Sequence, residues 1–199
     1  MARTRASDFE EKQHGILQSA AAVFAQQGME KASMAQIASH CNVSKALLYH
    51  YYPSKEQLIF EIVHSHLVDL EAGIAAAVDP ALAPTVQLRI LISTVLEKYR
   101  GADDAHKVQL VGTSALSDDQ LMRIRSVERR IVRHFSDVLK RINPHLDTPE
   151  RPLLMPVTMS LFGMMNWVYM WFREGGPITR EDYADVATTL ILEGVKSVR

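Results

Sequence analysis

Signals for the start of a helix recur along the chain and constrain its fold more than any other feature. A serine followed three residues later by a glutamine forms a capping box, and this pattern occurs at residues 33–36, 54–57 and 117–120. Apolar residues elsewhere recur at helical spacing, and there is no sustained apolar–polar alternation and no Asn-Gly or Asp-Gly hairpin signal. The pattern predicts an all-α chain of about nine helices. Their expected positions are up to residue 27, 34–40, 45–52, 54–78, 85–100, 103–116, 117–142, 149–175 and 179–196.

Composition excludes several classes of protein. The net charge of -1 does not point to nucleic acid, so such a function requires locally placed charge. The single cysteine, Cys41, rules out an intrachain disulfide framework, and no His/Cys group has zinc-ligand spacing. The apolar run at residues 153–172 is as long as a membrane span, but three polar residues interrupt it, so we interpret it as a buried or interface helix. We expect a cytoplasmic protein without membrane partner, metal, cofactor or catalytic residues.

The segment from residue 33 to residue 52 has the layout of a helix-turn-helix. Asn42 stands where the turn needs a left-handed residue, which Asn tolerates better than most. Leu48 and Tyr52 are four residues apart, so both can face the core. The other side chains of the second helix can contact phosphates and base edges in a major groove. They are Lys45, Leu47, Tyr49, His50 and Tyr51. The spacing alone leaves open an ordinary helical hairpin with core aromatics.

Residues 43–58, with the sequence VSKALLYHYYPSKEQL, resemble the signature of the tetracycline-repressor (TetR) family of bacterial regulators. The apolar positions and glycine of residues 16–28 and the pattern of residues 33–38 also match it. The resemblance implies a DNA-binding domain of three helices at residues 1–53. It also implies an effector-binding and dimerisation domain at residues 54–199, with the helix of about 54–78 connecting the two. The implied assembly is a homodimer formed through the last two helices.

The same signature assigns residues to double-stranded operator DNA. Ser33 and Lys55 are expected to contact phosphates, and Leu47 is expected to contact a thymine methyl group. The full expected set is Ser33, Ser44, Lys45, Leu47, Tyr49, His50, Tyr51 and Lys55. This chain departs from the family at Asn42 and Ala46, where Gly is frequent, and in the order of His50 and Tyr51. The last two departures put the base preference in doubt, though not the docking mode. Arg3 and Arg5 form either an arm that reaches DNA or a disordered polar tail.

The effector half is less distinctive. Residues 162–177 are rich in Met, Trp and Tyr, which by composition indicates core or dimer seam. The stretch from residue 144 onward also resembles the acyl-CoA-responsive branch of the TetR family. Acyl-CoA requires cations for its phosphates and an aromatic surface for its adenine. The candidate effector-binding residues are therefore Arg125, Arg129, Trp167 and Trp171. A solvated face whose arginines pair with Asp137 and Glu128 remains the alternative.

The favoured hypothesis is a sequence-specific DNA-binding transcriptional regulator, a repressor that a small-molecule effector releases from a palindromic operator. An acyl-CoA thioester is one candidate effector, and a lipophilic drug-like ligand is another. The alternative of a different class is a helical ligand carrier or enzyme that does not bind DNA. No paired acid–base constellation supports an enzyme. The operator, the effector and the sign of regulation are not set by the sequence.

Overall fold

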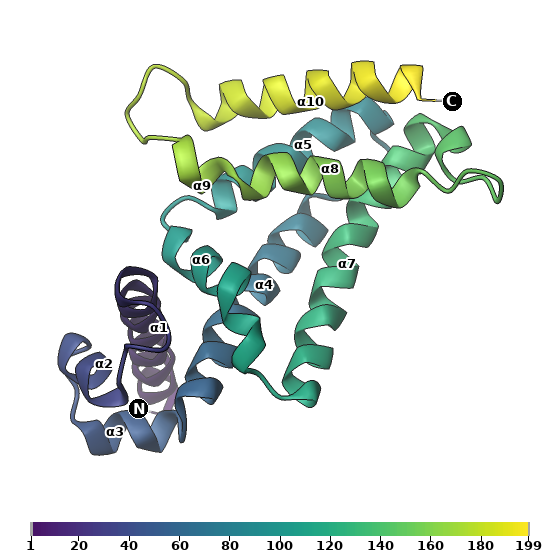
Figure 1. The fold of residues 1–199 in the computed structure, drawn as a ribbon. Helices are drawn as coiled ribbons and strands as arrows, with labels where there is room; N and C mark the ends of the chain where they lie inside the picture. The colour runs from purple at the N-terminus through teal and green to yellow at the C-terminus, as the bar shows by residue number, and fades with distance from the viewer. Residues whose placement is uncertain (1, 199) are drawn as a thin grey trace. The chain divides into compact units, whose positions relative to one another are not determined.

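The computed structural model describes residues 2–198, with side chains described from residue 12 onward, and its regular elements are helical apart from one isolated bridge. Figure 1 labels the helices along the chain. They are α1 (Ala2–Gln27), α2 (Met34–His40), α3 (Lys45–Tyr51), α4 (Lys55–Ala77), α5 (Pro84–Lys98), α6 (Asp103–Gly112), α7 (Asp118–Ile142), α8 (Leu154–Asn166), α9 (Val168–Trp171) and α10 (Arg180–Ser197). Two 3-10 turns lie at Thr113–Ala115 and Pro144–Leu146.

The prediction of an all-α fold with about nine helices is confirmed. The eighth expected helix is present but is divided into α8 and α9. The backbone N–H of Trp167 donates to the carbonyl of Met165, so the α-helical ladder is interrupted there and α9 begins at Val168. The helix of residues 117–142 agrees within one residue with α7, and the capping box at residues 117–120 is complete.

Two expectations about helix ends are wrong. The eighth helix begins at Leu154 rather than near Pro149, because Asp147 bridges to Pro152 and closes a turn before it. The sixth ends at Gly112 and continues as a 3-10 turn. The backbone is helical from Ala2, and an arm formed by Arg3 and Arg5 stays a prediction.

The capping box expected at residues 54–57 is only half formed. The backbone N–H of Gln57 donates to Ser54 Oγ at 3.1 Å. The side chain of Gln57, however, donates to Glu61 at 2.9 Å and accepts from Gln120 Nε2 at 3.0 Å. Contacts along α4 and with α7 have therefore taken the side-chain atoms that the reciprocal bond would need.

The chain divides into two compact units. The first comprises Met1–Val68 and Gly101–Ser126, and the second comprises Asp69–Arg100 and Val127–Arg199. Helices α4 and α7 each contribute residues to both units. The predicted boundary at residue 53 separates DNA-binding residues from effector-binding residues and is not a boundary between compact units. It stays a prediction.

In the first unit, α1 packs against α2 and α6, and α2 packs against α3. The predicted inward face of α1 is buried at Ile16, Ala20, Val23 and Phe24. Helix α6 approaches the α1–α2 loop closely at Gly112. A Cβ atom there would lie 2.9 Å from Met29 Sδ and 3.1 Å from Ile59 Cγ2.

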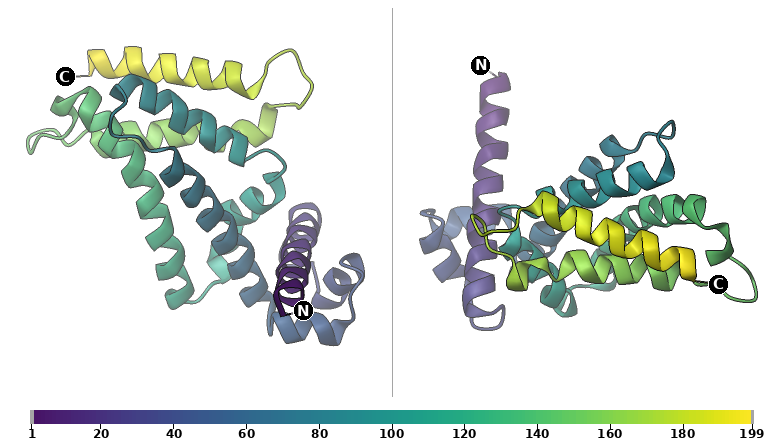
Figure 2. Two further views of the ribbon diagram at one scale, coloured as in Figure 1. Left: turned by 180° about the vertical axis from the view of Figure 1, so that it is seen from behind. Right: turned by 90° about the horizontal axis from the view of Figure 1, so that it is seen from above.

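In the second unit, α10 packs against α5 and α8, as both views of Figure 2 show. Apolar side chains of α5, α7, α8 and α10 form the core of this unit. They include Leu88, Leu91, Val95, Ile131, Phe135, Leu139, Leu161, Phe162, Met165, Ala184, Ala187 and Ile191. Among the described residues, no helix is long and apolar enough to cross a membrane.

Candidate functional site

The turn between α2 and α3 has the geometry that a helix-turn-helix requires. Asn42 adopts φ +53°, which confirms the left-handed conformation predicted for it. The N–H of Asn42 donates to Ser39 O at 3.1 Å, and the N–H of Val43 donates to Ala38 O at 3.0 Å. This pair of bonds is a Schellman motif, which satisfies the last carbonyls of α2 and turns the chain sharply. The direction of α3 is therefore set within a few residues of α2.

The inner face of α3 anchors the helix to the first unit. Leu48 and Tyr52 are buried as predicted, with exposed fractions of 0% and 1%. Burial raises the pKa of Tyr52 to about 12, so its hydroxyl stays neutral at physiological pH. Burial likewise raises the pKa of the Cys41 thiol, with a smaller opposing effect from Ser19. These groups are structural rather than reactive.

The outer face of α3 carries most of the side chains that the sequence assigned to DNA. Lys45, Tyr49 and His50 are exposed, and the ammonium of Lys45 lies 5.7 Å from the centre of the Tyr49 ring. The Tyr51 ring is half-buried and meets His50 edge-on at 5.8 Å between centroids. Leu47 is also half-buried. One helix face thus presents a cation, an imidazole and a phenol, all able to donate hydrogen bonds.

The two serines of the candidate site are helix caps. Ser33 Oγ accepts from the N–H of Gln36 at 3.3 Å, and Gln36 Oε1 accepts from the N–H of Ser33 at 2.9 Å, which completes a capping box. Ser44 Oγ accepts from the N–H of Leu47 at 3.1 Å. Both serines are exposed at the first turn of a helix. A phosphate placed there would meet the free N–H groups of that turn, while the hydroxyl of Ser33 itself donates to Gln36 Oε1 at 2.9 Å.

Lys55 is placed differently from the other candidates. Its ammonium donates to the carbonyls of Met29 at 2.8 Å, Glu30 at 3.4 Å and Ala32 at 3.4 Å. The side chain is half-buried against the loop between α1 and α2. Sequence reasoning missed this arrangement because the partners lie at least 23 residues apart, and no local pattern signals such a contact.

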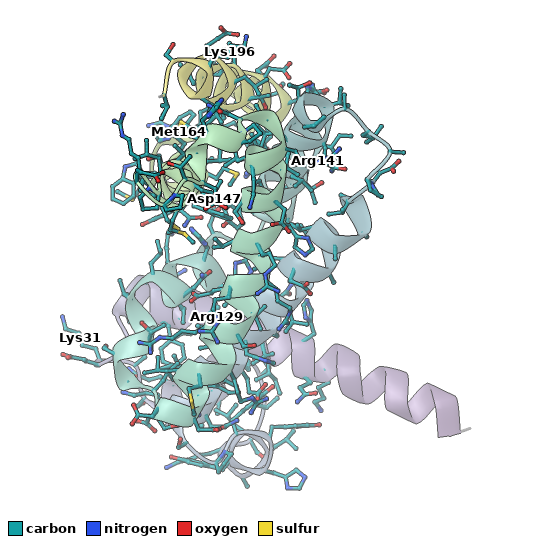
Figure 3. The ribbon with its side chains drawn as sticks, turned by 90° about the vertical axis from the view of Figure 1, so that its right-hand side faces the viewer. Lys31, Arg129, Arg141, Asp147, Met164 and Lys196 are labelled. Carbon is teal, nitrogen blue, oxygen red and sulfur yellow. The ribbon has the colours of Figure 1, made fainter. Side chains whose placement is uncertain are left out.

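The four candidate effector residues are not gathered into one site by any described contact. Arg125 belongs to the first unit, and the other three belong to the second. Arg125 and Arg129 are exposed on α7, and Figure 3 labels the second of them. Trp167 and Trp171 are 58% and 45% exposed. Trp171 packs edge-on against Tyr183 at 4.9 Å between ring centroids.

The neighbouring arginines of α7 differ in their surroundings. The guanidinium of Arg130 lies 3.6 Å from the carboxylate of Glu71, and that of Arg123 lies 4.7 Å from the centre of the Phe60 ring. No ion pair is formed by Arg125, Arg129 or Arg133 among the described side chains. Arg125 and Arg129 are exposed, as the solvated-face alternative also requires, so the choice between that face and an effector site stays a prediction.

Two hollows occur in the second unit, and other residues line them. One, of about 580 Å³, lies where the C-terminal ends of α7 and α10 meet, and its lining includes Ile142, Asn143, Arg151 and Val195. The other, of about 410 Å³, lies along α5 from Arg89 to Lys98. Within the described residues, no group of three His, Cys, Asp or Glu side chains could hold a metal ion.

Comparison with known proteins identifies the family. Residues 16–62 match the family model of bacterial regulatory proteins of the tetR family, and residues 81–195 match that of the tetracyclin repressor-like C-terminal domain. The chain is 25% identical over 196 residues to the HTH-type transcriptional repressor KstR2 of Mycobacterium tuberculosis, with 90% of each chain covered.

Two solved structures extend this comparison. A TetR-family transcriptional regulator from Bordetella parapertussis 12822 is 30% identical, with a TM-score of 0.83 and coverage of 92% of this chain and 95% of that one. AibR in complex with isovaleryl coenzyme A and operator DNA is 25% identical, with a TM-score of 0.77 and coverage of 90% and 97%. The two family models together span both the helix-turn-helix and the C-terminal helices. This chain is therefore a transcriptional regulator rather than an enzyme, and it belongs to the tetracycline-repressor family.

Proposed function

We propose that this protein is a homodimeric repressor that binds a palindromic operator through α3 and is released by a small-molecule effector. Residues 1–53 act as the DNA-binding domain, and residues 54–199 receive the effector and form the dimer. The observation that carries the proposal is the outer face of α3, where Lys45, Tyr49 and His50 are exposed on a helix fixed by its own turn. Two such helices, about 34 Å apart in a dimer, fit successive major grooves.

Exposed apolar stripes on α8 and α10 support the dimer. Along α8, Met155 and Met159 lie four residues apart and are 54% and 50% exposed. Along α10, Val186 and Leu190 have the same spacing and are 51% and 60% exposed. Residues four apart share one helix face, so each helix presents a continuous apolar strip. A second copy of this chain would bury both strips in one isologous interface.

An acyl-CoA thioester is the effector that the proposal favours. AibR, which is similar to this chain along most of its length, is known in complex with isovaleryl coenzyme A. In the second unit, Arg129 has no ion-pair partner among the described side chains, and Trp167 and Trp171 expose aromatic surface. Cations and aromatic rings are the groups that recognise the phosphates and adenine of coenzyme A.

Selection from a random duplex library, followed by titration at several salt concentrations, tests the DNA-binding part. Lys45→Ala and Tyr49→Ala should each weaken binding to the selected duplex by about tenfold, the cost of one good base or phosphate contact. Lys107→Ala removes a lysine of α6 that pairs with Asp104, and it should bind like the wild type. A protein that selects no sequence at any salt concentration would refute the proposal.

Sedimentation tests the dimer interface. Leu190→Asp places a charge in the strip on α10 and should yield monomers that bind the selected duplex at least about a hundredfold more weakly, since the two half-sites are then bound separately. Val111→Asp changes an equally exposed apolar residue of α6 and should remain dimeric. A dimer that survives the α10 substitution would place the interface elsewhere.

Thermal unfolding distinguishes the effector classes. An acyl-CoA that binds the folded protein raises the melting temperature, and above Kd the rise grows with the logarithm of the ligand concentration, whereas free coenzyme A should have a smaller effect. Arg129→Ala should reduce the rise with acyl-CoA. If lipophilic cations raise the melting temperature and thioesters do not, the regulator responds to drug-like ligands instead.

A further inference from the structure

We propose that Lys55 is a positioning residue, which fixes the start of α2 for DNA binding rather than contacting a phosphate. Its ammonium holds the loop between α1 and α2 through three backbone carbonyls, those of Met29, Glu30 and Ala32. The proposal rests on the DNA binding proposed above. It differs from the role that the family signature suggests for this position.

Three backbone carbonyls surround the ammonium of Lys55, one at a short distance and two at longer distances. A lysine ammonium has three N–H donors and no acceptor. The three carbonyls lie 2.8, 3.4 and 3.4 Å from Nζ, so each can take one donor. The side chain is half-buried against them. Turning the ammonium toward a phosphate would break these hydrogen bonds, of which those to Met29 and Ala32 are part-buried.

The loop that Lys55 holds leads directly into the candidate site. Gly28 ends α1 with φ +82°, and the N–H of Ala32 donates to Gly28 O at 3.2 Å. The next residue is Ser33, the N-cap of α2 and a candidate phosphate contact. A shift of the loop would therefore move both the Ser33 hydroxyl and the N-terminus of α2.

The same loop is fixed by packing as well. Because α6 has glycine at position 112, it comes close enough to touch the Met29 side chain. Met29 is thus held through its carbonyl by Lys55 and through its sulfur by α6. Lys31, in contrast, is exposed, and Figure 3 shows its side chain extending away from the unit. The loop therefore offers a lysine that carries the same charge without the carbonyl contacts.

The salt dependence of binding separates a positioning role from a phosphate contact. Each phosphate that a protein neutralises contributes about 0.9 to the slope of log K against log salt, so losing one contact per subunit changes the slope of a dimer by about 2. Lys55→Met keeps the aliphatic stem and removes the ammonium. We expect it to weaken binding to the selected duplex by about tenfold, since hydrogen bonds from a charged donor are lost, with the slope unchanged.

Two further measurements complete the experiment. In the DNA-free protein, amide hydrogen exchange at residues 29–36 should become faster in Lys55→Met and stay unchanged in Lys31→Met, which controls for the loss of charge. Lys55→Gln keeps a neutral donor and should recover part of the affinity and of the exchange protection. The slope is read from this variant if Lys55→Met does not fold.

Several outcomes would overturn the inference. A slope that changes by about 2 in the Lys55 variant but not in Lys31→Met would show a phosphate contact. Unchanged affinity, or unchanged exchange in the loop, would remove the positioning role. These outcomes differ from failure of the proposed function, in which the wild type selects no DNA. The exchange measurement still tests the Lys55 contacts in that case.

Discussion

The contacts inside the helix-turn-helix and the contacts inside the second unit differ greatly in how far apart in the sequence their partners lie. In the helix-turn-helix, the bonds that set the turn and the caps join residues three to five positions apart, such as Val43 with Ala38 and Ser33 with Gln36. In the second unit, the guanidinium of Arg180 reaches Leu96 O over 84 residues, and Tyr99 reaches Asn166 over 67. The shape of the first is therefore encoded in short segments, and that of the second depends on the assembled fold.

This difference fits the two roles that we propose. A DNA-reading helix must keep one geometry, which local caps and a fixed turn provide. A unit that responds to an effector needs contacts that can rearrange, and long-range contacts between helices are of this kind. Even so, the first unit has its own dependence on distant residues, through Leu48 in the core and Lys55 on the loop.

The largest expected effect tests whether the local caps alone are enough to hold α3 in place. Leu48→Ala removes a fully buried side chain from α3 and should lower the free energy of unfolding by about 3 kcal/mol, because a cavity remains. Urea unfolding followed by circular dichroism measures the loss. Leu47→Ala, at a half-buried neighbouring position, should cost less than half as much. Equal losses would mean that α3 is held by its caps rather than by its anchor.

Arg180 tests the long-range contacts of the second unit. Its buried guanidinium donates to Leu96 O at 3.0 Å and to Glu174 at 2.7 Å. Arg180→Leu should lower the free energy of unfolding by about 2 kcal/mol, since a carbonyl loses a charged donor. Hydrogen exchange should become faster at the start of α10 and stay the same in α3. Arg89→Leu, which breaks an exposed pair with Asp185, should have a much smaller effect. Faster exchange in α3 would contradict the separation of the two regions.

Asn42 gives a smaller effect that is purely local. Asn42→Ala should destabilise the protein by about 1 kcal/mol. The left-handed conformation crowds the Cβ atom of either residue, but only Asn has a polar side chain that can compensate through local hydrogen bonds. Asn42→Gly should be neutral or stabilising, since glycine adopts this conformation freely. Chemical denaturation of both variants measures the difference. A loss of stability in Asn42→Gly would show that the Asn side chain, and not the backbone, sets the turn.

The smallest effect concerns pH and the first turn of α10. Hydrogen bonds from the Thr179 side chain and backbone hold the pKa of Asp182 below its ordinary value. A carboxyl group with a lowered folded-state pKa stabilises the protein above its unfolded pKa, and the contribution is lost as pH falls through the folded pKa. Asp182→Asn should therefore narrow the difference in urea midpoint between pH 7 and pH 3. An unchanged difference would show that the capping box contributes nothing through charge.

The candidate site was predictable where its causes are local. The left-handed Asn42, the buried Leu48 and Tyr52, and the complete capping box of Ser33 all follow from residues within one or two helical turns. The carbonyl contacts of Lys55 were not predictable in this way, because its partners belong to a loop far earlier in the chain. The assignment of Arg125, Arg129, Trp167 and Trp171 to an effector stays a prediction, since packing, and not a local pattern, brings α7 and the Trp-bearing segment to their positions.

The sequence by itself determined the helices, the turn of the helix-turn-helix and the family, because caps, periodicity and turn residues act over a few positions. Tertiary structure decided which local signals were used. The side chain of Gln57 bonds Glu61 and Gln120 instead of the backbone N–H of Ser54. The turn closed by Asp147 and Pro152 shifts the start of α8 to Leu154. A polar side chain bonds whichever partner the packed chain brings closest with good geometry, and a short sequence window does not contain that partner.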